Sequence, residues 1–304
     1  MPIRVDDKLP AHKSLEKENI FVMANYRAEH QDIRPLKIVL LNLMPTKIET
    51  ETQFLRILSN SPLQVDVDFL HTATHKAKNT SEEHLIKFYN TLDEIKDNRY
   101  DGMIVTGAPV EKMEFEEVDY WQELCDIFEW SKTHVYSTFN VCWGAQAALY
   151  YRYKIPKYPT EKKIFGVFPH KSLDSLHPLV RGLDDVFYVP HSRHTETHMD
   201  DIAKVKDLQI ITYSEMSGIH LMSDMDCRNF YSTGHSEYVS DTLAREYFRD
   251  LKAGMPIDVP YNYFPGDDPQ KKPIVSWRSA ANLIFSNWLN YFVYQKTPYD
   301  LSKL

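Results

Sequence analysis

The first half of the chain alternates between short apolar runs and segments whose apolar residues have helical spacing. The run at residues 36–44 is almost continuously apolar, which is typical of a strand buried on both faces. The same alternation predicts further strands at 65–70, 102–106 and 135–139, and helices at 48–59, 81–95 and 118–131. This order of elements predicts right-handed crossovers and a doubly wound, mostly parallel α/β sheet.

The second half carries shorter apolar runs that follow one another more closely. Strands are expected at 164–168, 186–189, 208–213, 218–222 and 230–233, so the pattern favours additional short strands, some of them antiparallel. A helix is expected over 241–252, a loop over 255–273, and a final aromatic helix over 277–294. We interpret residues 1–34 as an N-terminal extension that packs on the core, and 35–304 as a single domain.

The sharpest local pattern lies where the strand at 135–139 gives way to a helix at Cys142. The segment reads Phe-Asn-Val-Cys-Trp-Gly-Ala-Gln, so small, helix-forming residues begin directly after the cysteine. A thiol on such a strand-to-helix turn faces the first helical N–H groups, which favour its thiolate form. Gly144 is expected to let the start of the helix pack closely against the neighbouring strands. The pattern therefore predicts a nucleophile.

A second pattern, about ninety residues later, supplies a base for this thiol. The strand expected at 230–233 is followed by Gly-His-Ser-Glu, which places His235 and Glu237 two residues apart. The glutamate can then orient the imidazole, and the imidazole can accept the proton of a nucleophile. We predict a catalytic triad of Cys142, His235 and Glu237. Cys125, on an apolar helical face, and Cys227, in an Asp-Cys-Arg segment, are interpreted as structural.

Composition and charge exclude several classes of protein. The chain has 304 residues, of which 43% are hydrophobic, which allows a large core. Its net charge of -8 argues against a general nucleic-acid binder. We expect no membrane partner, since no segment approaches the ~20 apolar residues of a membrane span, and three unpaired cysteines favour a cytoplasmic protein.

Five motifs together resemble the homoserine O-acyltransferases of methionine biosynthesis, within the class I glutamine amidotransferase-like, flavodoxin-like fold. They are Leu-Asn-Leu-Met-Pro-Thr-Lys at 41–47, Thr-Gly-Ala-Pro at 106–109, Phe-Asn-Val-Cys-Trp-Gly-Ala-Gln-Ala at 139–147, Pro-His-Ser-Arg-His-Thr at 190–195 and Gly-His-Ser-Glu-Tyr at 234–238. The resemblance spans nearly the whole chain and implies that residues 35–304 form one amidotransferase-like catalytic domain.

The resemblance also implies a reaction. Cys142 would take the acyl group of an acyl-coenzyme A as a thioester, with the oxyanion held by backbone N–H groups of Trp143, Gly107 and Ala108. His235, oriented by Glu237, would then activate the γ-hydroxyl of L-homoserine. Ping-pong kinetics, no cofactor and a homodimer are expected. Coenzyme A enters as part of a substrate.

Substrate recognition is assigned by the resemblance to Lys163, Ser192 and Arg249. A guanidinium at position 249 suits the carboxylate of an amino acid, whereas Lys163, beside Lys162 and Glu161, would be classed as surface charge from the sequence alone. Ser192 is placed in a polar turn.

Glu111 corresponds to a position associated with donor choice in the family, where glutamate accompanies acetyl and glycine accompanies succinyl transfer. A glutamate there would fill the acyl pocket and repel a succinyl carboxylate, so acetyl is expected. The alternatives are a succinyl donor, or an exposed loop acid like Glu114, Glu116 and Glu117.

Three further hypotheses stay open at this stage. His191, His194 and His198 with Glu196 have the spacing of metal ligands on a helix, but Pro190 favours a loop and we expect no metal. A glutamine amidotransferase or γ-glutamyl hydrolase would use the same triad. A noncatalytic protein of this fold is a third possibility, which the intact triad disfavours.

Overall fold

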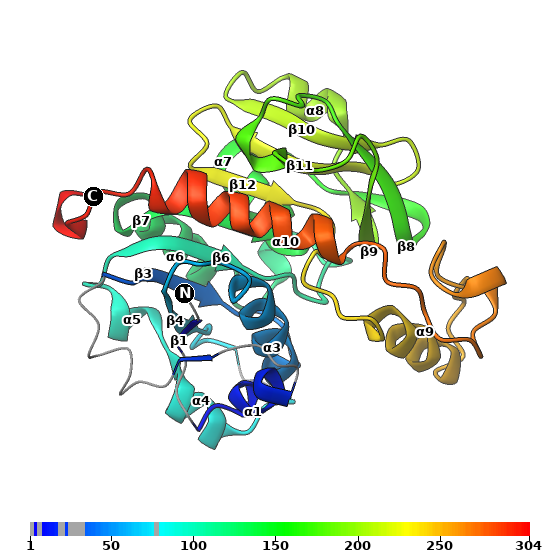
Figure 1. The fold of residues 1–304 in the computed structure, drawn as a ribbon, viewed down its shortest axis with the longest axis horizontal. Coiled ribbons are helices and arrows are strands. Elements are labelled where there is room, and N and C mark those ends of the chain that lie inside the picture. Colours follow the sequence, from blue (N-terminus) through cyan, green and yellow to red (C-terminus); the bar gives the residue numbers. More distant parts are fainter. Residues whose placement is uncertain (1–2, 5–7, 18–21, 24–33, 76–78) are drawn as a thin grey trace.

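The computed structural model describes residues 3–4, 8–17, 22–23, 34–75 and 79–304, and it shows one mixed sheet with helices on both faces (Figure 1). The strands of the first half are β1 (Ile3–Arg4), β2 (Val22–Met23), β3 (Leu36–Leu41), β4 (Val65–Leu70), β5 (Tyr89–Asn90), β6 (Tyr100–Val105) and β7 (Val135–Val141). Those of the second half are β8 (Tyr158–Ser172), β9 (Phe187–Glu196), β10 (Leu208–Ser214), β11 (Gly218–Asp224) and β12 (Asn229–Ser232).

The helices follow the strands closely in the first half and are sparser in the second. They are α1 (Pro10–Lys17), α3 (Lys47–Leu58), α4 (Glu82–Phe88), α5 (Leu92–Ile95), α6 (Trp121–His134), α7 (Trp143–Tyr153), α8 (Met199–Ala203), α9 (Thr242–Lys252) and α10 (Arg278–Asn287). Helix α10 continues without a break into a π-helical segment, η4 (Trp288–Tyr294). The predicted helix at 277–294 is thus confirmed in position, with looser winding in its second half.

The sheet has a parallel half and an antiparallel half. Its strand order is β2-β1-β4-β3-β6-β7-β12-β11-β10-β8-β9, with β5 paired to β4. All pairs from β2 to β12 are parallel, and all pairs from β12 to β9 are antiparallel. The predicted doubly wound, mostly parallel α/β sheet is confirmed, and so are the predicted antiparallel additions. Strands β8 and β9, with 15 and 10 residues, are longer than the short strands expected, because they pair with each other along most of their length. Because the strands from β2 to β12 are parallel, their carboxyl ends all lie at the same end of the sheet, and Cys142 lies at that end.

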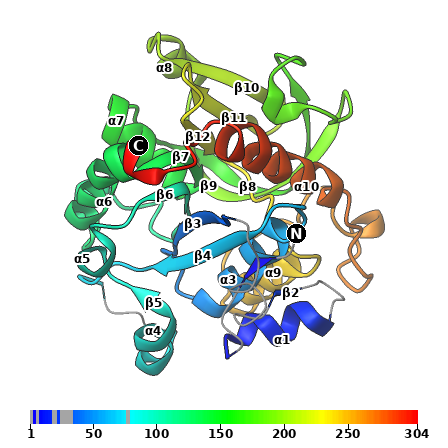
Figure 2. The same cartoon turned by 60° about the vertical axis from the view of Figure 1, so that its left-hand side comes forward.

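Two apolar cores cover the two faces of this sheet. Ile38, Phe54 and Trp288 belong to the core beneath α3 and α10. Val39 and Leu124 belong to the core beneath α6 and α7. Adjacent residues of β3 therefore point into different cores, which is why its sequence is apolar almost throughout. Figure 2 shows α6 and α7 on one side of the strands and α3 and α10 on the other.

Three sequence-based predictions are wrong in detail. The single helix expected at 81–95 is divided into α4 and α5, because residues 89–90 form β5 and pair with β4. The first strand ends at Leu41, three residues early. The segment at 190–195, expected to be a loop and to hold Ser192 in a turn, lies within β9. Proline is tolerated there because β9 is at the edge of the sheet.

The described part of the N-terminal segment contacts the rest of the molecule. Leu9, Ala11 and Leu15 are buried in the same core as residues of α3, and β1 pairs with β4. The division of the chain at residue 34 stays a prediction. In the described ranges, none of the helices is long and apolar enough to cross a lipid bilayer.

Candidate active site

Cys142 sits on a strained turn between β7 and α7. Its backbone has φ 52° and ψ -119°, in the left-handed region that a residue with a side chain seldom adopts. Its N–H donates to the carbonyl of Ser232 on β12 at 2.6 Å, which fixes the turn to the neighbouring strand. The side chain is buried among the ends of these strands. The predicted strand-to-helix elbow is confirmed.

Two glycines make this turn possible. A Cβ atom at Gly144 would come within 2.5 Å of the carbonyl oxygen of Thr106, so the predicted close packing of the helix start is confirmed. A Cβ atom at Gly107 would lie 3.2 Å from Cβ of Cys142, and 3.7 Å from both the Cys142 sulfur and Cε1 of His235. The thiol and the imidazole therefore flank the same glycine.

His235 and Glu237 form a buried hydrogen-bonded pair. Nδ1 of His235 lies 2.7 Å from Oε1 of Glu237, and both side chains are almost fully buried. Burial opposes the imidazolium, but Cys142 and Glu237 outweigh this effect and raise the pKa of His235 well above its ordinary value. The ring also stacks on Tyr238, with 4.2 Å between ring centroids. The structure thus brings the three triad residues together, while their catalytic roles stay predictions.

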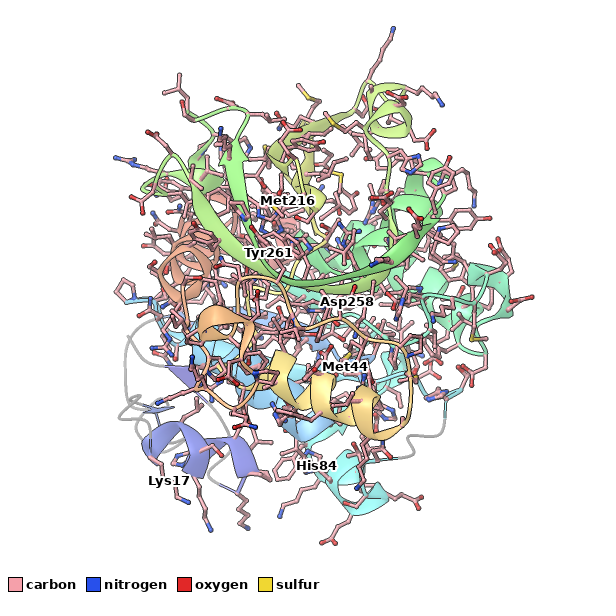
Figure 3. All side chains as sticks on the ribbon, turned by 90° about the vertical axis from the view of Figure 1, so that its right-hand side faces the viewer. Lys17, Met44, His84, Met216, Asp258 and Tyr261 are labelled. Carbon is pink, nitrogen blue, oxygen red and sulfur yellow. The ribbon has the colours of Figure 1, made fainter. Side chains whose placement is uncertain are left out.

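A cavity of about 320 Å³ opens in front of the thiol. Most of the residues that the sequence analysis assigned to the site line it: Gly107, Ala108, Glu111, Cys142, Lys163, Ser192, His235 and Arg249. Figure 3 looks at the side of the molecule on which α9 lies, with the labelled Met44 next to this helix. The labelled Met44, from the loop after β3, lines the cavity together with residues of α9. The cavity is therefore built by segments that lie far apart in the sequence, from Met44 to Met255.

Lys163 is part of this cavity, although its sequence context suggests surface charge. Its side chain is only 13% exposed, and Nζ lies 3.3 Å from a carboxylate oxygen of Asp250 and 3.5 Å from one of Glu246. The ammonium also lies 4.2 Å from the ring centroid of Phe165. Strand β8 brings Lys163 here because it is 15 residues long and reaches across to α9.

Ser192 and Arg249 line the same cavity from β9 and α9. The hydroxyl of Ser192 donates to a carboxylate oxygen of Glu246. The guanidinium of Arg249 pairs with Asp250 at 2.6 Å, while its side chain is 65% exposed and free to face a ligand. The predicted substrate residues are thus brought together, and their role in binding stays a prediction.

The sequence analysis missed three residues of this wall. Tyr238 donates its hydroxyl to Glu246 at 2.9 Å, and Asp250 holds both Lys163 and Arg249. Glu246 and Asp250 are four apart on α9, a spacing that places them on one face with Arg249 beside them. The spacing of four residues is visible in the sequence, but the sequence does not show which face of this helix points toward Cys142.

Glu111 is half-buried and lines the cavity, unlike the exposed Glu114, Glu116 and Glu117 that follow it. Burial raises its pKa, and a hydrogen bond from the backbone of His194 together with the charges of Lys163, His235 and Arg193 opposes this rise. The alternative of an exposed loop acid is therefore wrong. The role of Glu111 in the choice of acyl donor stays a prediction.

The predicted oxyanion donors surround the thiol. Trp143 is the first residue of α7, directly after Cys142, and the turn at Gly107 and Ala108 packs on the other side of the sulfur. The N–H groups of Ala145 and Gln146 already donate to the carbonyl of Cys142. The assignment of Trp143, Gly107 and Ala108 as donors stays a prediction.

The histidines considered as metal ligands do not share a face. His191 is buried on β9, His194 lines the cavity, and His198 stacks on Tyr158 at the start of α8. In the part of the chain that the structure describes, no group of three histidine, cysteine, aspartate or glutamate side chains is arranged to hold a metal ion.

The fold places the chain in a known structural class. The structure resembles a glutamine amidotransferase from Thermotoga maritima with a TM-score of 0.57, at 10% identity, covering 86% of this chain and 100% of the other. A glutamine amidotransferase from Methylobacillus flagellatus gives a TM-score of 0.52 at 11% identity, covering 85% and 95%. The chain thus has the class I glutamine amidotransferase-like fold, as predicted.

Comparison of the sequence identifies the family within this class. Residues 2–299 match the model of the homoserine O-succinyltransferase family, and the chain belongs to this family. Homoserine O-acetyltransferases from Acetivibrio thermocellus and Bacteroides fragilis are 58% and 56% identical to it over the full length of both chains. One from Methanomethylophilus alvi is 55% identical over 100% of this chain and 98% of its own length. The predicted family is confirmed.

Proposed function

We propose that this chain transfers the acetyl group of acetyl-coenzyme A to the γ-hydroxyl of L-homoserine, through a thioester on Cys142. The observation that carries this proposal is the single cavity that joins Cys142 and His235 to the charged residues of β8 and α9. Such a cavity offers a nucleophile and its base at one end and groups for a zwitterionic acceptor at the other. Membership of the family and the names of the relatives support the same reaction.

In the first half-reaction, His235 holds the proton of the Cys142 thiol, and the thiolate attacks the carbonyl carbon of the thioester. The carbonyl oxygen takes the negative charge beside the backbone N–H groups of the Trp143 and Gly107 turns. When the tetrahedral intermediate collapses, the bond to the coenzyme A sulfur breaks and that sulfur takes the proton from His235. The acetyl group stays on Cys142 and the imidazole is neutral.

In the second half-reaction, neutral His235 accepts the proton of the homoserine γ-hydroxyl as the oxygen attacks the acetyl thioester. Glu237, 2.7 Å from Nδ1, stabilises the imidazolium that forms. The bond to the Cys142 sulfur then breaks, which releases O-acetylhomoserine and regenerates the thiolate-imidazolium pair. Burial of the thiol limits the access of water, which would otherwise hydrolyse the intermediate.

The charges of the cavity wall match a zwitterionic amino acid. The guanidinium of Arg249 and the ammonium of Lys163 are suited to its carboxylate. Glu246, beside Lys163 and held by Tyr238 and Ser192, is suited to its ammonium. With both ends fixed in this way, the short side chain would direct its hydroxyl toward Cys142.

Replacing Arg249 by methionine is expected to raise the KM for homoserine about 100-fold, because a charge-assisted bidentate contact contributes about 2 to 3 kcal/mol. The first half-reaction should be nearly unchanged, since it needs no homoserine. Rapid-mixing measurement of the first burst of coenzyme A, followed by steady-state kinetics, separates the two effects.

Arg245→Met is the matched control, because Arg245 lies one turn earlier on α9 and pairs with Glu49 and Asp241 outside the cavity. An equal loss in both half-reactions of the Arg249 variant would show that this arginine supports the fold and not the acceptor.

The acyl donor is part of the proposal, since the family description names succinyl and the relatives' names give acetyl. Glu111 supports acetyl, because a half-buried carboxylate in the cavity disfavours a second carboxylate there.

The purified protein, mixed with acetyl-coenzyme A, should release free coenzyme A in quantity only when L-homoserine is added. Glutaminase activity without this release would instead favour the glutamine amidotransferase hypothesis, and hydrolysis of γ-glutamyl substrates the hydrolase hypothesis. No turnover of either kind would favour a noncatalytic protein. Light scattering of the same sample tests the predicted homodimer.

A further inference from the structure

Arg193 is a buried cation that is held by backbone carbonyls and a histidine. Its side chain extends from β9 into the interior, and the residue is 2% exposed. The guanidinium donates to the backbone carbonyls of Thr195, at 2.7 Å, and Ser217. In the described ranges of the chain, no aspartate or glutamate lies within ion-pair distance of it. Because burying a charge without a counter-ion is destabilising, such a residue calls for a functional explanation.

A chain of neutral histidines holds this guanidinium. Nε of Arg193 donates to Nδ1 of His191 at 3.5 Å, so the proton of His191 is on Nε2. Nε2 of His191 lies 3.2 Å from Nε2 of His170, whose Nδ1 lies 3.0 Å from the carbonyl of Phe168. A carbonyl only accepts, so His170 carries its proton on Nδ1 and accepts from His191 on Nε2. The three hydrogen bonds of this series therefore run in one direction: Arg193 donates to His191, His191 to His170, and His170 to the carbonyl of Phe168.

Burial keeps these rings uncharged. It lowers the pKa of His170 to about 4, with the charge of Arg193 adding to the effect. Burial also lowers the pKa values of His191 and His220, a third ring packed 5.1 Å from His170. The positive charge thus stays on Arg193.

The same cluster supports the active-site loop from behind. A Cβ atom at Gly234 would lie 3.0 Å from the ring of His191, and the N–H of His235 donates to the carbonyl of Pro190 at 2.8 Å. Along β9, Ser192 and His194 face the cavity, while His191 and Arg193 alternate with them and face the interior. Arg193 therefore lies on the buried face of β9, beneath the residues of this strand that line the cavity.

The charges that Arg193 faces converge on the thiol. Burial lowers the pKa of Arg193, and the groups that oppose this are Cys142 first, then Glu196 on its own strand and Glu111 from the cavity loop. Cys142 shares its cavity with His235, Tyr238 and the charged side chains of Glu111, Lys163, Glu246, Arg249 and Asp250, while Glu237 lies behind the imidazole. Of these groups, only the Cys142 sulfur gains and loses negative charge during the proposed reaction.

We propose that Arg193 is a positioning residue for this reaction: the two carbonyls and the neutral His191–His170 pair fix its guanidinium beneath the active site, where its charge stabilises the ionised sulfur of Cys142. The inference rests on Cys142 as the nucleophile. It gives a reason for burying a cation that has no carboxylate within ion-pair distance among the described residues. The sulfur of Cys142, besides pairing with the imidazolium of His235, offers Arg193 a negative charge that is absent only while the acyl group is attached.

A charge in this place has a distinctive effect on pH dependence. Arg193 favours loss of the thiol proton, and by like-charge repulsion it also favours the later loss of the imidazolium proton of His235. Removing the charge should therefore move both limbs of the pH profile of kcat/KM to higher pH. Loss of a purely structural residue would lower the rate at all pH values without this joint displacement.

The experiment measures alkylation of Cys142 by iodoacetamide against pH in the wild type and in Arg193→Gln and Arg193→Met, with folding checked by circular dichroism. At pH values below the midpoint of the rate-against-pH curve, both variants should be alkylated about threefold to tenfold more slowly than the wild type. This corresponds to a midpoint of that curve about half to one pH unit higher. Arg193→Lys, which keeps a cation, should restore most of the wild-type profile. Coincident profiles for wild type and a folded neutral variant would overturn the inference.

Arg228→Met is the matched control, because Arg228 also donates to two carbonyls, those of Val135 and Tyr136, but at the opposite end of β7 from Cys142. It should leave both limbs in place, and an equal displacement in this variant would count against a local effect of Arg193.

If the neutral variants do not fold, the wild type still provides the test. The ¹⁵N signal of a slowly exchanging arginine Nε should shift as Cys142 titrates and should not shift in Cys142→Ala. Absence of any such response would also overturn the inference. A wild-type Cys142 no more reactive than Cys125 would contradict the proposed function itself, so the two failures are distinguishable.

Discussion

Cys142→Ala is expected to lose at least about 10³-fold in kcat, because both half-reactions pass through the sulfur of this residue. Cys142 is the one cysteine among the described residues that line the cavity, so no second thiol is at hand to replace it. The measurement is coenzyme A release from acetyl-coenzyme A in the presence of homoserine. Mass spectrometry of wild-type protein incubated with acetyl-coenzyme A alone should also show one added acetyl group on the peptide that contains Cys142.

Cys125→Ala is the control for this experiment. Burial raises the pKa of the Cys125 thiol to about 11, so it is not ionised near neutral pH and should carry no acetyl group. Its replacement should leave the rate almost unchanged. If the Cys142 variant keeps most of its activity, or if the acetyl group is found on another residue, the covalent mechanism is wrong.

Glu111→Gly is expected to change the ratio of acetyl to succinyl transfer about 100-fold in favour of succinyl. Two unit charges about 6 Å apart at an effective dielectric constant of about 20 repel by about 3 kcal/mol, and the substitution removes this repulsion. It also opens volume in the cavity and removes one of the negative charges that Lys163 faces. The measurement is kcat/KM for both donors at a fixed homoserine concentration.

Two variants separate the reasons for this change. Glu111→Gln keeps the volume and removes the charge, so the part of the effect that it reproduces is electrostatic. Glu114→Gln, an exposed acid of the same loop, should have no effect. Because burial raises the pKa of Glu111, its charge is lost at a higher pH than for an ordinary glutamate, so the wild type should discriminate less at acidic pH. A wild type that prefers succinyl-coenzyme A would show that the donor assignment is wrong.

The charged wall of the cavity shows how one helix can organise two substrates. Asp250 is buried and pairs with both Lys163 and Arg249, so it holds two cations at the position proposed for one carboxylate. Glu246 contacts Ser192, Tyr238 and Lys163, and it connects the acceptor side of the cavity to the ring that stacks on His235. Substitutions in α9 are therefore expected to affect acceptor binding more than the first half-reaction.

The sequence by itself determined the elements that depend on local patterns. The buried strands of the parallel half follow from continuous apolar runs, since neighbouring side chains of β3 enter opposite cores. The elbow at Cys142 follows from a β-branched run that stops before small helix-forming residues. The pairing of His235 with Glu237 follows from a spacing of two residues at the end of a strand. In each case, residues close in sequence determine the outcome.

Other features depended on contacts between distant segments, and only the tertiary structure decided them. Residues 89–90 became a strand because β4 offered a partner, and 190–195 became a strand because β8 pairs with it, although both segments carry signals for other structures. Lys163 reads as surface charge until β8 carries it to α9, some 87 residues away in the sequence. Arg193 gave no signal of its own, because the histidines and carbonyls that hold it come from β8, β9 and the Ser217 turn. Burial and charge pairing arise between segments, and a one-dimensional pattern does not record which segments meet.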